Sequence, residues 1–417
     1  MSLLSSAMSA ASGAVSGALS AGLAAALQSA PALLTYDALR TKYNEFSLPR
    51  SVIEFNGKPF EAGNIIVTDI NVEATCGFEA SVARFRLYNV FSPSTGKFQY
   101  DLIQNDVTLG SALTIKLGYL NALSVVFVGF VANISFGFDP TDLPYIEITG
   151  MDAKGLMMAS SYAAQLTAKS YGEAVSEILG RTAYEKLRTT GAVTSVNVTD
   201  TPDKKSGPTG GNGLGGGSKA SAETIEMVEE SDYEFIVKAA KKFNYEFFVD
   251  RGAIYFRKAR STNAVLMELG VGSGLLGFEV SYTLTGLVGS VEVRAMNPDT
   301  GKAISSVKQL TANISTGTRA KPLISGAKKV YIDPTVMSQE QADARASYLA
   351  DEIGYRLGTL ECSCPGIPDL APGQFVRVSG LGSPIDNIFY VTSVTHDFRS
   401  ESGYQTKLIA KASEVKK

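Results

Sequence analysis

The chain contains one histidine, His396, so chemistry that needs an imidazole must take place there. His396 with Ser393 or Ser400 and with Asp397 could form a serine–histidine–acid triad, which activates a serine hydroxyl as a nucleophile. These residues lie on or just after one predicted strand, whereas such triads are normally assembled from separate elements. We therefore expect His396 to be a structural, hydrogen-bonding histidine, and we predict no catalytic residue.

Cys362, Cys364 and His396 could supply three soft ligands to zinc. Their spacing lacks the two-residue separation of a zinc knuckle, and apolar strand packing explains both cysteines. Cys362 and Cys364 are two residues apart in a predicted strand, so they face the same side at roughly 7 Å, a poor separation for a disulfide. With Cys76 the chain has only three cysteines, which suits assembly in a reducing cytoplasm. We predict no metal and no cofactor.

Gly211, Gly213 and Gly216 satisfy the G-x-G-x-x-G spacing of dinucleotide-binding loops. No predicted strand precedes them and no helix begins directly after them, so the structural context of that motif is missing. The Gly-Ser-Lys sequence that follows has the wrong order for a phosphate-binding loop. We interpret residues 204–221, which are rich in Gly, Ser and Lys, as a flexible loop.

The composition argues against several classes of function. The net charge is −3 and no basic stripe is found, so a duplex DNA-binding protein is not indicated. The 41 acidic residues offer carboxylate pairs for glycoside hydrolysis, but no segment is left over for a separate catalytic cleft. A chain of 417 residues with 40 glycines and 45% hydrophobic content indicates a β-rich protein of roughly two to three globular units.

Alternating apolar and polar residues predict two β-domains, over residues 51–155 and 266–417. Arg84-Phe85-Arg86-Leu87 and Val291-Glu292-Val293 show this period of two, and Gly, Asn and Pro turns separate the segments. One predicted helix, with an apolar stripe at residues 342–353, interrupts the second domain. The pattern is typical of small antiparallel barrels or sandwiches and indicates an α+β, mainly β fold.

A small α/β insert is predicted between the two β-domains, over residues 156–265. Two Ser-x-x-Glu sequences, which start at Ser170 and Ser231, have the spacing of capping boxes that begin helices. A predicted β-hairpin over residues 245–256 completes the insert.

Residues 1–50 form a predicted N-terminal low-complexity arm. Residues 1–36 contain no charged side chain and are dominated by Ala, Ser, Gly and Leu. Gly13 and Gly17 have the small-xxx-small spacing that allows close helix approach, which favours an ordered or lumen-lining helical arm. A disordered tail and a signal or membrane segment are the alternatives, although a basic n-region and a strong apolar run are both absent.

Four segments, taken in order, carry a resemblance to a known family. They are Leu109–Ser111 and Leu113–Gly118 with Val126–Phe130; Glu229–Phe235 with Phe243–Phe247; Val291–Val293 with Asn297–Lys302; and the C-terminal run Ala342–Leu349, Pro365–Gly373, Tyr390-Val391, Thr395–Phe398 and Gly403–Thr406. Over residues 51–413 their order and spacing resemble the phage late control gene D family of baseplate hub proteins. That family also forms the hub part of the valine-glycine repeat spike proteins of type VI secretion. Asn244 stands where the family more often has Gly, and the match covers neither the arm nor residues 204–221.

The resemblance implies a trimeric baseplate hub in which each chain contributes two tube-like antiparallel β-barrels. Six barrels would adapt the sixfold inner tube to the threefold spike of a contractile injection system, whether a phage tail, a tail-like bacteriocin or an extracellular injection particle. The implied partners are the first ring of inner tube protein, the baseplate wedge components and a separate spike protein, because no spike segment follows Lys417. The implied location is the virion or particle baseplate, after assembly in the bacterial cytoplasm.

The arm, residues 1–50, is expected to lie in the tube lumen, where it meets the tape-measure protein or blocks the channel. We expect no specific nucleic acid, no stable membrane span and no enzyme activity. A tail-tip cell-wall hydrolase is the alternative function. A plain tube or tail-terminator protein is a further rival, but it needs only one barrel. Residues 91–107 are a candidate docking loop, with a long hairpin connection as the alternative.

Overall fold

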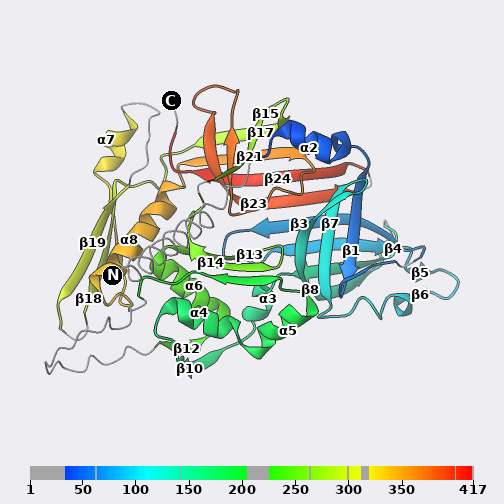
Figure 1. Ribbon diagram of the computed structural model, residues 1–417, viewed down its shortest axis with the longest axis horizontal. Helices are drawn as coiled ribbons and strands as arrows, with labels where there is room; N and C mark the ends of the chain where they lie inside the picture. Colours follow the sequence, from blue (N-terminus) through cyan, green and yellow to red (C-terminus); the bar gives the residue numbers. More distant parts are fainter. Residues whose placement is uncertain are drawn as a thin grey trace, which may run out of the picture.

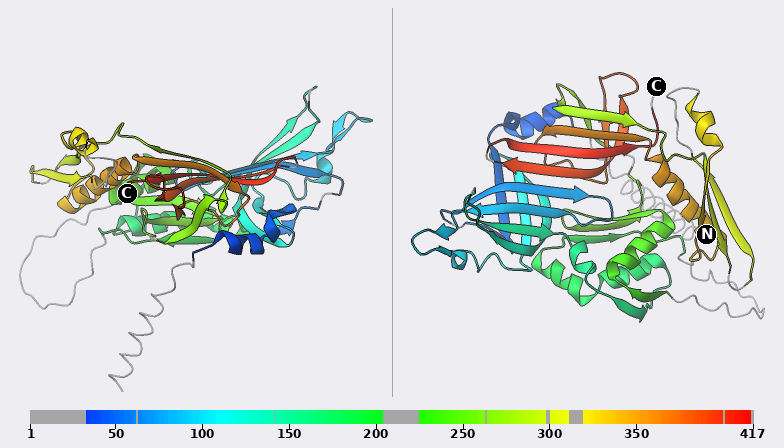
Figure 2. Two further views of the ribbon diagram at one scale, coloured as in Figure 1. Left: turned by 90° about the horizontal axis from the view of Figure 1, so that it is seen from above. Right: turned by 180° about the vertical axis from the view of Figure 1, so that it is seen from behind.

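The structure is a computed structural model that describes residues 33–61, 63–140, 142–203, 225–262, 264–297, 300–310, 319–399 and 401–415. The chain is mainly β, as predicted, and is built on one 14-stranded sheet with smaller sheets and short helices beside it (Figure 1). Figure 2 shows this large sheet from a second direction as a long, twisted layer. Among the described residues, no helix is long and apolar enough to cross a membrane.

The first β-region contributes the strand order β3-β4-β9-β8-β7-β1, with every neighbouring pair antiparallel. The bounds are β1 (Pro49–Phe55), β3 (Ile66–Thr75), β4 (Val82–Tyr88), β7 (Ala112–Tyr119), β8 (Ala122–Gly137) and β9 (Tyr145–Met151). The alternation that predicted these strands is confirmed in β4, where Phe85 and Leu87 are buried and Arg84 is exposed. Period-two patterning therefore places one face of each strand in the core.

The second β-region continues the same sheet through one long strand, β23 (Asn387–Arg399). The first residues of β23 pair with β22 (Phe375–Val378), and residues 393–398 pair with β3 of the first region. The remaining strands are β15 (Val265–Val271), β16 (Gly274–Leu275), β17 (Gly277–Tyr282), β21 (Gly358–Pro365) and β24 (Gly403–Ala412). Side chains from both β-regions consequently share one hydrophobic core.

The large sheet branches at β23 and ends at three strands, β16, β17 and the short β2 (Lys58–Pro59), and no sheet of the described residues closes on itself. Two separate, closed barrels therefore stay a prediction, whereas the mainly β architecture is confirmed. The continuous pairing through β23 was not expected, because residues more than three hundred positions apart in the sequence must meet to form it.

The insert has its own hydrophobic core. Its main elements are α4 (Tyr171–Leu179), α5 (Thr182–Thr190), α6 (Asp232–Phe243), β10 (Tyr162–Gln165), β11 (Ser195–Val198), β12 (Glu226–Glu230), β13 (Tyr245–Asp250) and β14 (Ala253–Lys258). The capping box that starts at Ser231 is confirmed, since Ser231 and Glu234 bond each other's backbone N–H groups. Ser170 caps α4, but Glu173 bonds the N–H of Lys169 instead of that of Ser170.

A third unit lies at the other end of the molecule from β5 and β6 (Figure 1). It is a three-stranded sheet in the order β19-β18-β20, with α8 packed on one face and a core of its own. The bounds are β18 (Ser290–Met296), β19 (Ala303–Gln309), α7 (Ala320–Ser325), β20 (Lys328–Ile332) and α8 (Gln339–Gly354). These residues belong to the predicted second β-domain, but their strands do not pair with the large sheet.

The described end of the predicted arm is folded. α2 (Tyr36–Lys42) begins after Thr35, whose hydroxyl accepts a hydrogen bond from the N–H of Ala38. Tyr43 is buried, and its hydroxyl donates to Asp369 of the second β-region at 2.6 Å. The N-terminal helix is thereby anchored to a distant part of the chain. The rest of the arm, residues 1–32, lies outside the described residues, as do the predicted loop 204–221 with its glycine motif and Ser400.

Candidate interaction surface

His396 lies in β23 and is only 2% exposed. Its Nδ1 atom is 2.9 Å from the Tyr404 hydroxyl and 3.2 Å from the Thr406 hydroxyl, both on the neighbouring β24. Burial lowers the pKa of His396 to about 3, and the positive charge of Arg251 acts in the same direction. The imidazole is therefore neutral at ordinary pH and takes part in a hydrogen-bond network inside the sheet.

Ser393 and Asp397, the described members of the possible triad, do not lie beside the His396 side chain. Side chains alternate along a strand, so Ser393 and Asp397 lie on the opposite face of β23 from His396. Ser393 lines an outer groove, and Asp397 accepts a hydrogen bond from Arg399 at 3.0 Å. Ser393, His396 and Asp397 consequently do not form a catalytic triad.

Cys362 and Cys364 are buried on one face of β21, and no described cysteine forms a disulfide. The contact with Cys362, followed by burial, raises the pKa of the Cys364 thiol well above its ordinary value. Across the described ranges, no group of three or more His, Cys, Asp or Glu side chains could hold a metal ion. Cys362 and Cys364 therefore supply apolar packing for the sheet.

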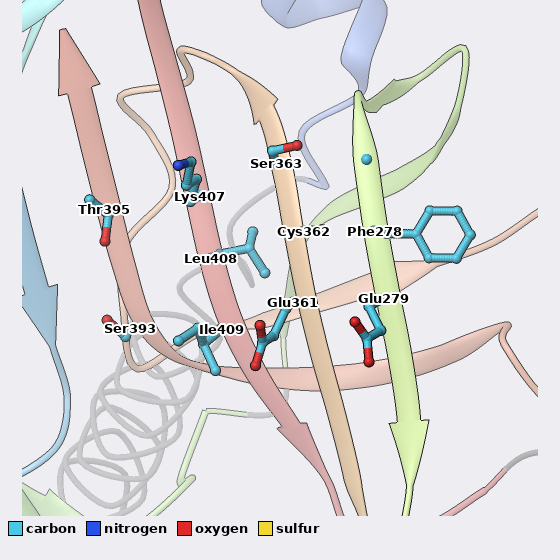
Figure 3. A pocket seen from close by; sticks show the side chains of 11 residues that line it. Phe278, Glu279, Glu361, Cys362, Ser363, Ser393, Thr395, Lys407, Leu408 and Ile409 are labelled. Atoms are coloured by element: carbon cyan, nitrogen blue, oxygen red, sulfur yellow. The ribbon is translucent and has the colours of Figure 1, made fainter.

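The outer face of the second β-region carries a shallow groove of about 400 Å³ (Figure 3). Four neighbouring strands, β17, β21, β24 and β23, provide its lining residues. Ile409 is 41% exposed in the groove, with Ser393, Thr395 and Lys407 beside it. An open groove of mixed polarity on a strand surface suits binding of another polypeptide.

Two glutamates lie side by side in this groove. Glu279 of β17 is directly opposite Glu361 of β21 in the antiparallel register, and Figure 3 shows both side chains on the groove face. Like charges placed directly opposite each other destabilise a sheet. Neither glutamate forms an ion pair or hydrogen bond with another described residue, although Lys407 lines the same groove. The pair therefore favours a ligand that brings a cationic group.

β17 also has an unpaired edge, because among the described strands it pairs only with β21. The N–H of Thr283 donates to the carbonyl of Leu357 at 2.9 Å, just past the end of β17. Hydrogen bonds alternate along an antiparallel ladder, so the N–H groups of Phe278, Val280 and Tyr282 point to the free edge. Such an edge can accept a further strand from another chain.

The predicted docking loop, residues 91–107, is a folded segment. It contains the short hairpin of β5 (Phe91–Ser92) and β6 (Lys97–Phe98), followed by the 3₁₀ turn η2 (Tyr100–Leu102). The hairpin projects at one end of the molecule (Figure 1). Its role in docking stays a prediction.

Neither the groove nor its glutamates were predicted from the sequence. Residues 277–282 alternate in the manner of a strand, which was the available signal. Whether that strand lies at an edge depends on its pairing with β21, about eighty residues further along the chain. Local patterning contains no information on that pairing.

Three solved structures of similar fold span almost the whole chain, at low sequence identity. The tail protein from Neisseria meningitidis MC58 is 12% identical with a TM-score of 0.60, and the alignment covers 88% of this chain and 97% of that one. The 43 kDa tail protein of prophage MuSo2 from Shewanella oneidensis is 14% identical with a TM-score of 0.60, covering 87% and 98%. An Escherichia coli protein described as a component of the type VI secretion system is 11% identical with a TM-score of 0.50, covering 86% and 76%.

Sequence comparison adds little to the structural comparison. The family model of the Alg8 N-terminal domain matches residues 217–400, fewer than half of the 417 residues. No curated protein matches the chain. The resemblance to phage tail and baseplate proteins is confirmed at the level of the fold, and the chain has the fold of phage tail proteins.

Proposed function

We propose that this chain is a structural hub protein in the baseplate of a contractile injection system. The observation that carries the proposal is the tail-protein fold, which extends over 87–88% of the chain and 97–98% of two tail proteins. A hub of this kind is a trimer in which each chain contributes two tube-like β-units to a ring that joins the sixfold tube to the threefold spike. Its partners are the inner tube protein, the spike protein and the wedge components, and it is assembled in the cytoplasm.

The edge of β17 supports a structural role through contact between chains. Obligate assemblies close rings by pairing or covering strand edges, which otherwise are sites of aggregation. β17 offers free backbone N–H groups, the Phe278 side chain that is 37% exposed, and the opposed carboxylates of Glu279 and Glu361. In the proposed hub this edge meets the neighbouring copy.

The mass of the purified protein in solution, measured by light scattering alone and with its spike protein, tests the proposal. A trimer, or a monomer that becomes a trimer when spike protein is added, is the expected result. A monomer that is indifferent to the spike protein would contradict the hub and would make hydrolase activity on peptidoglycan the next measurement.

Two lysine substitutions test the position of the contact. Phe278→Lys places a charge beside the free edge of β17 and is expected to lower the trimer fraction at least tenfold at a fixed concentration. Ile332→Lys, on the edge strand β20 where the side chain is 82% exposed, is the matched control and should leave the trimer intact. Loss of the trimer only in the control would show that another edge makes the contact.

The proposed role of the arm rests on its composition, since residues 1–32 carry no charged side chain. We expect three copies to gather in the tube lumen against the tape-measure protein or across the channel. Deletion of residues 1–32 leaves the Thr35 cap of α2 in place. Tubes of normal length and filling from the deleted chain would contradict this role.

A further inference from the structure

A cluster of aromatic side chains forms the projecting end of the first β-region. We call it the aromatic tip, and its members are Phe91, Phe98, Tyr100, Phe136 and Phe138. The rings of Phe91 and Phe98 are 5.3 Å apart edge to face, and the Phe136 ring contacts both Phe98 and Tyr100 at 5.5 Å. Phe138 joins the cluster through Phe91 at 5.6 Å. The tip therefore combines the β5–β6 hairpin with the end of β8, two segments that lie about forty residues apart in the sequence.

The aromatic tip exposes a large apolar surface. Phe136 is 48% exposed and Phe138 is 67% exposed, whereas a large aromatic side chain is ordinarily mostly buried. Leu102 at 60% and Leu143 at 69% add exposed aliphatic surface from the adjoining turns. Contiguous apolar patches of this kind on a soluble protein mark interaction sites.

Backbone pairing and ring packing within the chain hold the tip in place. β8 and β9 stay paired to the end, with Phe136 opposite Ile146 and Gly137 opposite Tyr145. A Cβ atom on Gly137 would lie 2.2 Å from the Tyr145 ring, so that ring packs directly on the backbone of β8. The Tyr100 hydroxyl also bonds the Val107 carbonyl and closes the loop behind the hairpin. Rigid aromatic anchors lose little conformational entropy on binding.

The charges around the tip restrict the kind of partner. Residues 91–107 and 136–145 contain four aspartates and one lysine, which gives a net charge of 1 − 4 = −3. The aspartates are Asp101, Asp106, Asp139 and Asp142, and the lysine is Lys97. Asp142 is already paired with Arg86 at 3.5 Å within the chain, so the charges that a partner would meet are those of Asp101 and Asp106. An anionic membrane surface would repel this end of the protein. A second copy of this chain, whose own net charge is −3, offers no general electrostatic attraction.

We propose that the aromatic tip docks into an apolar pocket, rimmed by lysine or arginine, on a different protein. Phe138 and Phe136 fill the pocket, and Asp101 and Asp106 pair with the basic rim, which orients the contact. The inference goes beyond the proposed hub role, because the tip lies in the first β-region and β17 in the second. The inference depends on the proposed hub role in one respect only, namely that the partner is expected to be another protein of the injection particle.

Site-specific photo-crosslinking in the producing cell tests this proposal. Phe138 is replaced by p-benzoylphenylalanine, and the same residue replaces Val228 in a matched control, since Val228 is 73% exposed on a different unit. The expected result is one discrete adduct of the position-138 chain with another protein, at a yield at least fivefold above the control. Mass spectrometry of the adduct is expected to place the crosslink beside lysine or arginine residues.

Charge removal separates specific docking from general stickiness. The double variant Asp101→Asn, Asp106→Asn is expected to lower the adduct yield severalfold without a change in thermal unfolding. An adduct with a second copy, an adduct with lipid, the absence of a discrete adduct, or a yield insensitive to the two aspartates would each overturn the proposal. Flotation of the purified protein with vesicles of phosphatidylglycerol and phosphatidylethanolamine should show no binding.

The outcomes also distinguish this proposal from the hub. A trimeric protein without a position-138 adduct would refute the docking proposal and leave the hub proposal standing. A discrete adduct with a protein that belongs to no injection particle would support the docking proposal and contradict the hub proposal.

Discussion

The buried His396 makes the stability of the fold depend on pH in a calculable way. Its pKa is lowered to about 3 in the folded chain, whereas an exposed histidine titrates near 6.5. Between these values the unfolded chain binds a proton that the folded chain does not bind. The free energy of unfolding therefore falls as the pH falls through this window.

The size of the effect follows from the two pKa values. On going from about pH 7.5 to about pH 5, the unfolded chain gains about 2 kcal/mol from protonation of this one side chain. The groups that face His396 do not offset the change, since Tyr404 and Thr406 present hydroxyls and Arg251 is itself positive. Because His396 is the only histidine, no other imidazole contributes to the window.

Urea denaturation at several pH values between 5 and 7.5 measures this dependence, and tyrosine fluorescence reports it because the chain has 18 tyrosines and no tryptophan. His396→Gln keeps a hydrogen-bonding side chain but removes the titration, so carboxylate effects common to both proteins cancel in the comparison. The wild-type chain should lose about 2 kcal/mol more than the variant across this range. Parallel pH curves for the two proteins would refute a neutral, buried His396.

Three further substitutions test packing and charge. Gly366→Ala would place a Cβ atom 2.1 Å from the buried Tyr404 ring and is expected to cost about 1–3 kcal/mol in thermal unfolding, whereas Gly326→Ala meets nothing within 4 Å and should be neutral. Lys154→Met leaves the buried carboxylate of Asp152 without its cation and is expected to cost about 3–5 kcal/mol in denaturant unfolding, and adding Asp152→Asn should recover part of that loss. Hydrogen bonds from Arg294 and Lys328 lower the pKa of Glu292 to about 2, so Glu292→Gln should destabilise the protein at neutral pH, with the difference vanishing as the pH falls from 4.5 to 2.

Local patterning predicted the strands of the large sheet, the helix α6 and the hairpin of β13 and β14. Each of these elements is specified by residues close together in the sequence, such as the capping pair of Ser231 and Glu234. The connection between the β-regions was not predictable in this way. The sequence of β23 has the same alternating pattern of apolar and polar residues whether the strand pairs with β22, with β3 or with both.

The interaction surfaces were predicted only in part. Residues 91–107 were predicted to be a docking loop because they form a long connection between strands. Phe136 and Phe138 of the aromatic tip lie some thirty residues later and meet the hairpin only in the folded chain. The opposition of Glu279 and Glu361 likewise arises from strand register. Surfaces formed by such long-range pairing have no signature in a single sequence.

The pairing of β23 with β3 also determines when the chain can finish folding. Thr75 at the end of β3 bonds Thr392 of β23, 317 residues later. During synthesis, one edge of β3 therefore stays open until almost the whole polypeptide has left the ribosome. Open strand edges on unfinished chains favour aggregation, and contacts of such long range form slowly. We therefore expect newly made chains to need protection from aggregation, and a chain truncated before residue 393 would keep this edge open permanently.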